Sequence, residues 1–189
     1  RDRMFANASE DEWDLTMAVH LKGHFTTARH AAAHWRDQAK AGETVDARII
    51  NTTSGAGLLG SVGQAAYSAA KGGIISLTLV QAAELGRYGV TANAIAPAAR
   101  TRMTEKVFAD TMAAPDDPGA FDEMAADNVA PLVAWLGSPD SAGVTGRVFD
   151  VTGQALSVAE GWHRGPTQQH PTDDPAQLGE VVQRLVAEA

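Results

Sequence analysis

Three side chains that can take part in proton chemistry lie within one stretch of the sequence, residues 48–71. Ser54 follows a short apolar run, and Tyr67 and Lys71 come later at a spacing of four. Residues four apart share one face of a helix, so the phenol and the ammonium should project to the same side. In open α/β sheets, ligands bind where a loop leaves the C-terminal end of a strand. These residues therefore form a candidate active site.

Each of the three residues also has a purely structural interpretation. Ser54 could hydrogen-bond a turn, Tyr67 could be a half-buried aromatic residue and Lys71 could be a solvated charge. The joint pattern favours the functional interpretation. A serine, a tyrosine thirteen residues later and a lysine four residues after that resemble the active-site signature of the short-chain dehydrogenase/reductase family. The flanking pairs Gly63-Gln64 and Ala69-Ala70 also match the family.

The resemblance implies a role for each of these residues. Tyr67 would exchange a proton with the substrate oxygen while hydride moves between the substrate carbon and C4 of a nicotinamide. A free phenol has a pKa of about 10 and is a poor base at neutral pH, but a nearby ammonium favours its ionised form. Lys71 would supply that charge and hold the nicotinamide ribose, and Ser54 would orient the substrate oxygen.

His20 stands where many family members have an asparagine. The family segment Val-Asn-Leu corresponds here to Val19-His20-Leu21. That asparagine helps to hold a water molecule in the proton relay, and a backbone carbonyl inside the helix could still bind this water. His20 is therefore either a relay residue or a histidine that merely packs.

A second altered segment, residues 97–104, resembles the family turn whose backbone holds the nicotinamide carboxamide. It assigns cofactor contacts to Pro97, Ala99 and Thr101, although Ala98 stands where glycine is usual and the threonine comes one position early. The substrate would contact Ser54, Gly55 and Met103.

Several flanking motifs narrow the resemblance, among them Trp13-Asp14, Gly23-His24-Phe25, Arg102-Met103-Thr104 and Ala130-Pro131-Leu132-Val133. They are most similar to the (3R)-hydroxyacyl-CoA dehydrogenase domain of type 2 multifunctional enzymes and to related bacterial hydroxysteroid dehydrogenases. This implies an oxidoreductase that uses NAD, with NADP as the alternative, on a hydroxyacyl-CoA or a hydroxysteroid.

The family's glycine-rich cofactor turn has no counterpart in this sequence. Arg1 falls just after the point where the family's Asn-Asn-Ala-Gly motif would end. The expected fold class is therefore α/β, a Rossmann-like doubly wound parallel sheet of which the chain forms the C-terminal half. A rival interpretation is a non-catalytic remnant, or an oligomerisation or interaction module that lacks cofactor binding. The reading frame upstream of Arg1 would distinguish them.

Apolar periodicity, capping residues and breakers predict the elements that position these residues. Ser9-Glu10-Asp11-Glu12 is a capping box that begins a helix. The expected elements are a helix over Glu10–Ala39, a strand over Arg48–Thr53, a glycine-rich loop, a helix over Gln64–Arg87, a strand over Val90–Ala96 closed by Pro97, mixed structure over Glu105–Asn128, a short helix over Pro131–Leu136 and a strand over Val144–Val151. We expect one domain over residues 1–160 and a surface extension with a helix after Asp174-Pro175 over residues 161–189.

Composition excludes several functions. A net charge of −8 without a basic run argues against nucleic-acid binding. The absence of cysteine excludes disulfides and cysteine-type zinc sites. His20, His24, His30 and His34 do not resemble a metal site, because further converging ligands are not evident. No segment resembles a signal peptide or a membrane span, so a cytoplasmic protein without membrane contact is expected.

The remaining expectations concern binding and assembly. The substrate should carry a large apolar group, because apolar residues follow Ser54 and the turn 97–104, which should border the substrate pocket. These residues are Leu58, Leu59, Met103, Val107, Phe108 and Met112. The cations Arg100, Arg102 and Lys106 are either CoA phosphate contacts or solvated charges. The resemblance implies a homodimer or homotetramer built on the two long helices. In isolation the chain should aggregate and be inactive, because the strand over Arg48–Thr53 would have an unpaired edge.

Overall fold

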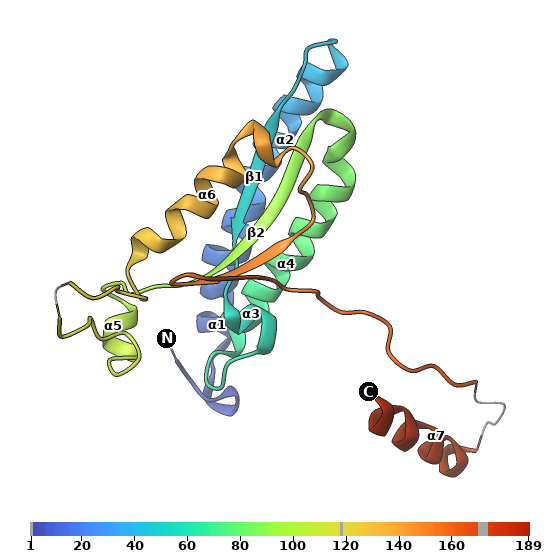
Figure 1. The fold of residues 1–189 in the computed structure, drawn as a ribbon. Helices are drawn as coiled ribbons and strands as arrows, with labels where there is room; N and C mark the ends of the chain where they lie inside the picture. Colours follow the sequence, from blue (N-terminus) through green and yellow to red (C-terminus); the bar gives the residue numbers. More distant parts are fainter. Residues whose placement is uncertain (1, 118, 170–173) are drawn as a thin grey trace. The chain divides into compact units, whose positions relative to one another are not determined.

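The computed structural model describes residues 2–117, 119–169 and 174–189, except for the side chains of residues 106 and 107. The chain forms two compact units, Arg1–Ala159 and Glu160–Ala189. The first unit contains a four-stranded sheet of order β1-β2-β3-β4 with helices packed on it (Figure 1). The predicted α/β class with a mainly parallel sheet is confirmed.

The predicted first helix is present, but it is interrupted by a π-helical turn. Its three parts follow a short η1 (Phe5–Asn7) and are α1 (Glu10–Met17), η2 (Ala18–Lys22), which is π-helical, and α2 (Gly23–Lys40). The capping box is confirmed: the Ser9 side chain accepts from the Glu12 N–H, and Glu12 accepts from the Ser9 N–H. The periodicity did not reveal η2, which contains His20.

The next elements bring a strand and a long helix together, as predicted. They are β1 (Ala47–Thr52), α3 (Gly55–Leu59), α4 (Ala65–Leu85) and η3 (Gly86–Tyr88). The expected loop after β1 is wrong in one respect, because its first half forms the single-turn helix α3. The Ser54 side chain caps this helix by accepting a hydrogen bond from the Ala56 N–H.

β2 (Val90–Ala98) continues through Pro97, so the prediction that proline closes this strand is wrong. Bonding sides alternate along a strand. The Ala94 N–H bonds toward the β3 side and the Ile95 carbonyl toward the β1 side. Pro97 therefore faces the β1 side, and β1 has already ended at the register of Ile95. The missing proline N–H costs no ladder bond there.

The second half of the first unit adds two strands to the sheet. Its elements are α5 (Thr104–Val107), η4 (Ala126–Val129), α6 (Ala130–Gly137), η5 (Pro139–Ser141), β3 (Val148–Thr152) and β4 (Ala155–Val158). The predicted strand over Val144–Val151 begins four residues late, at Val148, after Gly146 with its positive φ of 67°. β4, which was not predicted, folds back antiparallel on β3 after a turn at Gly153.

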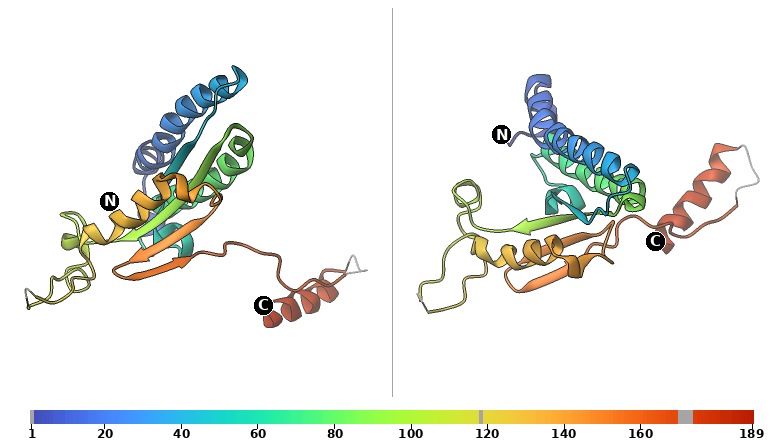
Figure 2. Two further views of the ribbon diagram at one scale, coloured as in Figure 1. Left: turned by 45° about the horizontal axis from the view of Figure 1, so that its top comes forward. Right: turned by 90° about the horizontal axis from the view of Figure 1, so that it is seen from above.

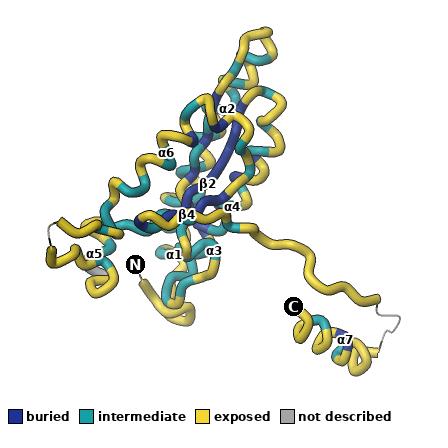
Figure 3. The backbone as a smooth tube through the Cα atoms, in the orientation of Figure 1, coloured by how far each residue is buried: buried dark blue, intermediate teal, exposed yellow. Residues whose placement is uncertain are grey.

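Helices cover both faces of the sheet, as expected for a doubly wound fold (Figure 2). Two clusters of buried residues form the core. One contains Ala47, Ile49, Val90 and Ala92 with partners from α2 and α4, and the other contains Ile95, Leu136 and Phe149 with partners from α6. Burial concentrates on β1 and β2, whereas β4 is exposed along its length (Figure 3). β1 pairs only with β2 among the described strands, so its other edge is unpaired, as predicted.

Among its described residues, the second unit contains one helix, α7 (Pro175–Glu188). The predicted start of a helix after Asp174-Pro175 is confirmed, because the Asp174 side chain accepts from the Ala176 N–H and proline occupies the first turn. The apolar side chains of Leu178, Val182 and Val186 on this helix are exposed. None of the helices that the structure describes is long and apolar enough to cross a membrane.

Candidate active site

Tyr67 and Lys71 lie on one face of α4, near the C-terminal end of β1. The Lys71 side chain is buried, and its ammonium donates to the Thr52 carbonyl at 2.9 Å. The Lys71 Nζ atom lies 5.5 Å from the centre of the Tyr67 ring. In turn, the Thr53 hydroxyl donates to the Lys71 carbonyl at 2.7 Å. The end of β1 therefore fixes both the backbone and the ammonium of Lys71.

Burial also changes the proton affinity of Lys71. The pKa of its ammonium is lowered from the ordinary value because burial penalises the charged form. An ammonium has three N–H donors, and the Thr52 carbonyl takes one of them. The remaining donors are those that a second ligand could use.

His20, in η2, contacts Tyr67 on α4. Its ring meets the Tyr67 ring edge to face, with the ring centres 5.1 Å apart and the planes at 85°. Burial is the largest cause that lowers the pKa of His20, and the charge of Lys71 is the next. The lowered pKa favours the neutral form of the His20 imidazole, which contacts the predicted acid–base residue Tyr67.

In the sequence His24 belonged to the flanking motif Gly23-His24-Phe25 and did not resemble a metal ligand, and the structure gives it a place beside the site. Its Nδ1 lies 2.6 Å from the His20 carbonyl, and its Nε2 accepts from the Thr52 N–H at 3.3 Å. These partners assign a tautomer with the proton on Nδ1. His24 thus ties η2 to β1 beside Lys71. Only its spacing of four from His20 could have indicated this role.

Ser54 lies at the start of α3, directly after β1. Its hydroxyl oxygen accepts from the Ala56 N–H at 3.2 Å. Within the described residues it makes no hydrogen bond to Tyr67 or Lys71. Gly57, in the same short helix, touches α4 so closely that a Cβ there would lie 2.7 Å from the Lys71 carbonyl carbon. This contact sets the distance between α3 and the Lys71 backbone.

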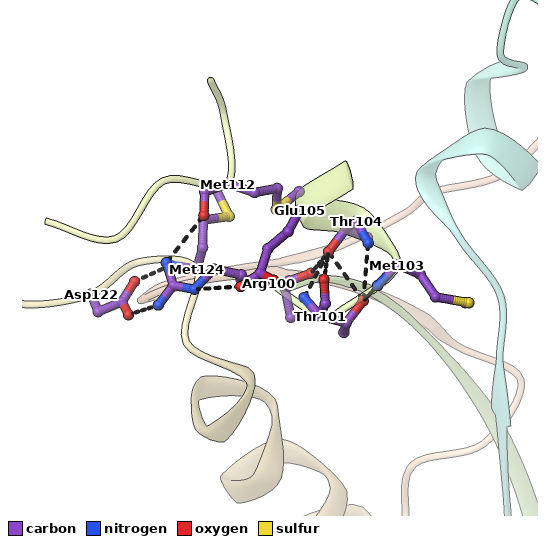
Figure 4. A network of polar contacts seen from close by, with 9 residues as sticks. Arg100, Thr101, Met103, Thr104, Glu105, Met112, Asp122 and Met124 are labelled. Atoms are coloured by element: carbon purple, nitrogen blue, oxygen red, sulfur yellow. Dashed lines mark hydrogen bonds and ion pairs between the residues drawn. The ribbon is translucent and has the colours of Figure 1, made fainter. Parts of the chain in front are cut away.

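In the loop after β2, the hydroxyls of two threonines bond to backbone groups of the same loop. The Thr104 hydroxyl donates to the Ala99 carbonyl at 3.1 Å and accepts from the Thr101 N–H at 2.7 Å (Figure 4). The Thr101 hydroxyl accepts from the N–H groups of Met103 and Thr104. Thr101 is therefore engaged within the loop, and Pro97 lies in β2.

The residues predicted to contact substrate are apolar or small residues and cations. Gly55 begins α3, and the side chains of Leu59 and Met103 are strongly exposed. Arg100 does not point to solvent, because it pairs with Asp122 (Figure 4). Arg102 is exposed. Lys106 and Val107 lie outside the described side chains.

In the described part of the chain, no three His, Asp or Glu side chains converge in a way that could hold a metal ion.

The lowered pKa of His20 predicts a pH-dependent stability. An unfolded histidine has a pKa of about 6.5, so just below that pH the unfolded chain binds more protons than the folded chain. The free energy of unfolding should therefore fall as the pH drops from 7 toward 5, and His20→Gln should reduce that fall. Urea unfolding at several pH values measures it. His34→Gln, at an exposed position of α2, is the matched control. A His20→Gln profile parallel to wild type would contradict the assignment.

Comparison with known proteins identifies relatives of this chain. The family profile described as "Enoyl-(Acyl carrier protein) reductase" matches residues 1–155. Hydroxyacyl-CoA dehydrogenase ChsB1 of Mycobacterium tuberculosis is 52% identical over 166 residues, which are 86% of this chain and 51% of that protein. The human (3R)-3-hydroxyacyl-CoA dehydrogenase is 38% identical over 157 residues, which are 81% of this chain and 58% of that protein. The chain thus spans about half the length of these relatives.

Solved structures show the same relationship. A short chain dehydrogenase from Mycobacterium avium is 59% identical, with a TM-score of 0.87, and the match covers 100% of this chain and 61% of that one. The peroxisomal multifunctional enzyme type 2 of Drosophila melanogaster is 27% identical with a TM-score of 0.73, over 98% of this chain and 32% of that one. The resemblance drawn from the sequence motifs is confirmed: the chain belongs to the short-chain dehydrogenase/reductase family.

Proposed function

We propose that this chain carries the acid–base residues of a nicotinamide-dependent dehydrogenase that acts on the hydroxyl of a hydroxyacyl-CoA. The observation that carries the proposal is the buried Lys71 ammonium, held by the Thr52 carbonyl at 2.9 Å and 5.5 Å from the centre of the Tyr67 ring. The name of the M. tuberculosis relative supports the substrate class.

In this proposal Tyr67 takes the proton of the substrate alcohol, and the nearby ammonium of Lys71 stabilises the phenolate. The Ser54 oxygen already accepts from the Ala56 N–H. Its own proton is therefore available for donation to the substrate oxygen. His20 touches the other side of the Tyr67 ring.

The residues present suit a nicotinamide cofactor in one specific respect. Two donors of the Lys71 ammonium remain for the hydroxyls of a ribose, once the bond to Thr52 is counted. Pro97, Ala99 and Thr101 would border the nicotinamide through their backbone, since the hydroxyls of this loop bond within it. When bound, the cofactor accepts the hydride. We propose NAD, with NADP as the alternative.

The apolar rim of the site supports an acyl substrate. Leu59, Met103 and Phe108 expose 90%, 79% and 45% of their surface. Exposed apolar side chains of this size suit an acyl chain better than a sugar. Arg102 is the cation that we propose for a CoA phosphate, because Arg100 is occupied by Asp122.

We also propose a homo-oligomer in which α2 and α4 pack against their symmetry mates. A groove between these helices is lined by apolar side chains, including Phe25, Ala32, Leu77 and Val80, together with polar and charged ones such as Arg29, Arg36 and Glu84. Phe25 and Val80 are about half exposed. Such a surface is typical of self-association.

The proposed function is tested with the full-length protein that contains this chain. We expect NADH absorbance to rise when the protein meets NAD⁺ and a 3-hydroxyacyl-CoA, with saturation by both substrates. A hydroxysteroid serves as the competing substrate. If neither alcohol reduces NAD⁺ or NADP⁺ in a folded preparation, the proposal fails and a non-catalytic role is favoured.

A further inference from the structure

Arg100 connects the loop after β2 to three places further along the chain (Figure 4). Only 18% of its side chain is exposed. Its guanidinium pairs with the Asp122 carboxylate, donates to the Met112 carbonyl at 3.2 Å and approaches Glu105 to 3.7 Å. Its backbone N–H donates to the Met124 carbonyl at 2.6 Å. We call these contacts the Arg100 clasp.

Asp122 is itself held in position. One carboxylate oxygen accepts from the Met124 N–H at 3.1 Å, and the Asn128 amide donates to the Asp122 carbonyl at 2.9 Å. The bond from Arg100 is the largest cause that holds the pKa of Asp122 below its ordinary value. Asp122 is consequently an ionised and oriented partner, and charge-assisted bonds of this kind are among the stronger hydrogen bonds in proteins.

The clasp lies next to the residues that would border the substrate. Arg100 separates Ala99 from Thr101, and Met103 follows in the same loop. Met112, whose carbonyl accepts from Arg100, follows Phe108 by one turn, and the Met112 N–H donates to the Phe108 carbonyl at 2.9 Å. Loss of the clasp would release the turn that carries Phe108 and Met112 from the loop that carries Met103.

We propose that Arg100 is a positioning residue, and that the Arg100 clasp holds the turn of Phe108 and Met112 against the loop 99–104 to form the wall that receives an acyl chain. This inference rests on the proposed function. Arg100 does not touch the reacting atoms, so its removal should weaken substrate binding more than turnover. The effect should grow with the length of the acyl chain, because only a long chain reaches the wall.

The test uses Arg100→Ala, Asp122→Ala and the double variant of the full-length protein. With a long-chain 3-hydroxyacyl-CoA, we expect each single variant to raise KM about tenfold and to change kcat less than about twofold. The double variant should cost less than the sum of the two single variants, because both single variants remove the same Arg100–Asp122 pair. A short-chain substrate should show a smaller change in KM. Arg147→Ala, at an exposed position before β3, is the matched loss of one arginine.

Amide hydrogen exchange tests the Arg100 clasp independently of the proposed function. Amides of residues 108–117 should exchange faster in Arg100→Ala and in Asp122→Ala than in wild type or Arg147→Ala, whether or not the protein is an active dehydrogenase. Unchanged exchange would overturn the clasp. Faster exchange with an unchanged KM for the long-chain substrate, or with a loss confined to kcat, would overturn the positioning role. An inactive wild type would refute the proposed function and, with it, the acyl wall.

Discussion

Replacing Tyr67 with phenylalanine should lower turnover of the full-length protein by about 10²- to 10⁴-fold, the range that general acid–base groups contribute. The substitution removes one hydroxyl and keeps the ring, so the edge contact with His20 and the position above Lys71 are retained. The melting temperature should therefore stay close to that of wild type. Steady-state kinetics and thermal unfolding of the same preparation measure the two effects.

The second tyrosine of the chain provides the control. Tyr88 lies beneath the Arg87 guanidinium at 4.8 Å from its ring centre and belongs to η3, outside the candidate site. Tyr88→Phe also deletes one phenol hydroxyl and keeps the ring. We expect full turnover from this variant. Equal turnover of Tyr67→Phe and Tyr88→Phe would remove Tyr67 from the mechanism.

Adding one methyl group at Gly57 should destabilise the protein by about 1–3 kcal/mol, as overpacking of a tight contact does. A Cβ at this position would lie 2.7 Å from the Lys71 carbonyl carbon, 2.8 Å from the Lys71 Cβ and 2.9 Å from the Gly72 nitrogen. Two of these are backbone atoms, so a rotamer change cannot relieve the clash. Because Lys71 must shift with α4, we expect Gly57→Ala to lower turnover as well.

Gly55 in the same short helix is the matched site for stability. A Cβ there meets nothing within 4 Å. Gly55→Ala should leave the free energy of unfolding unchanged or raise it slightly, because alanine favours helix over glycine. Denaturant unfolding of both variants gives the comparison. If Gly57→Ala proved as stable as Gly55→Ala, the close approach of α3 to Lys71 would be wrong.

Periodicity and capping residues predicted the elements that repeat a simple pattern. The long helix from Glu10 was marked by a capping box, and the strand before Ser54 and the helix that carries Tyr67 and Lys71 by runs of apolar residues; the structure contains each of them. The π-helical turn was missed because it shifts hydrogen bonds by one residue and changes side-chain spacing little. β4 was missed because its four residues are all exposed and lack a core face.

In the candidate site, too, some residues could be placed from their spacing and others could not. A spacing of four was enough to place Tyr67 and Lys71 on one side of α4, and the structure brings them together. The positions of His24 and Arg100 were not predictable, since both bind backbone groups that residue types do not reveal. Lys71 is held by the Thr52 carbonyl for the same reason. Backbone partners become visible only once the fold is known.

The central claim is that a substrate hydroxyl is oxidised at Tyr67 with hydride leaving its carbon. The most direct measurement is isotope transfer: the full-length protein is incubated with NAD⁺ and a 3-hydroxyacyl-CoA that carries deuterium on C3. We expect the deuterium to appear on C4 of the NADH formed, and Tyr67→Phe to form very little of this labelled product. A 3-ketoacyl-CoA formed without deuterium in NADH, or wild-type rates of labelling by Tyr67→Phe, would contradict the account.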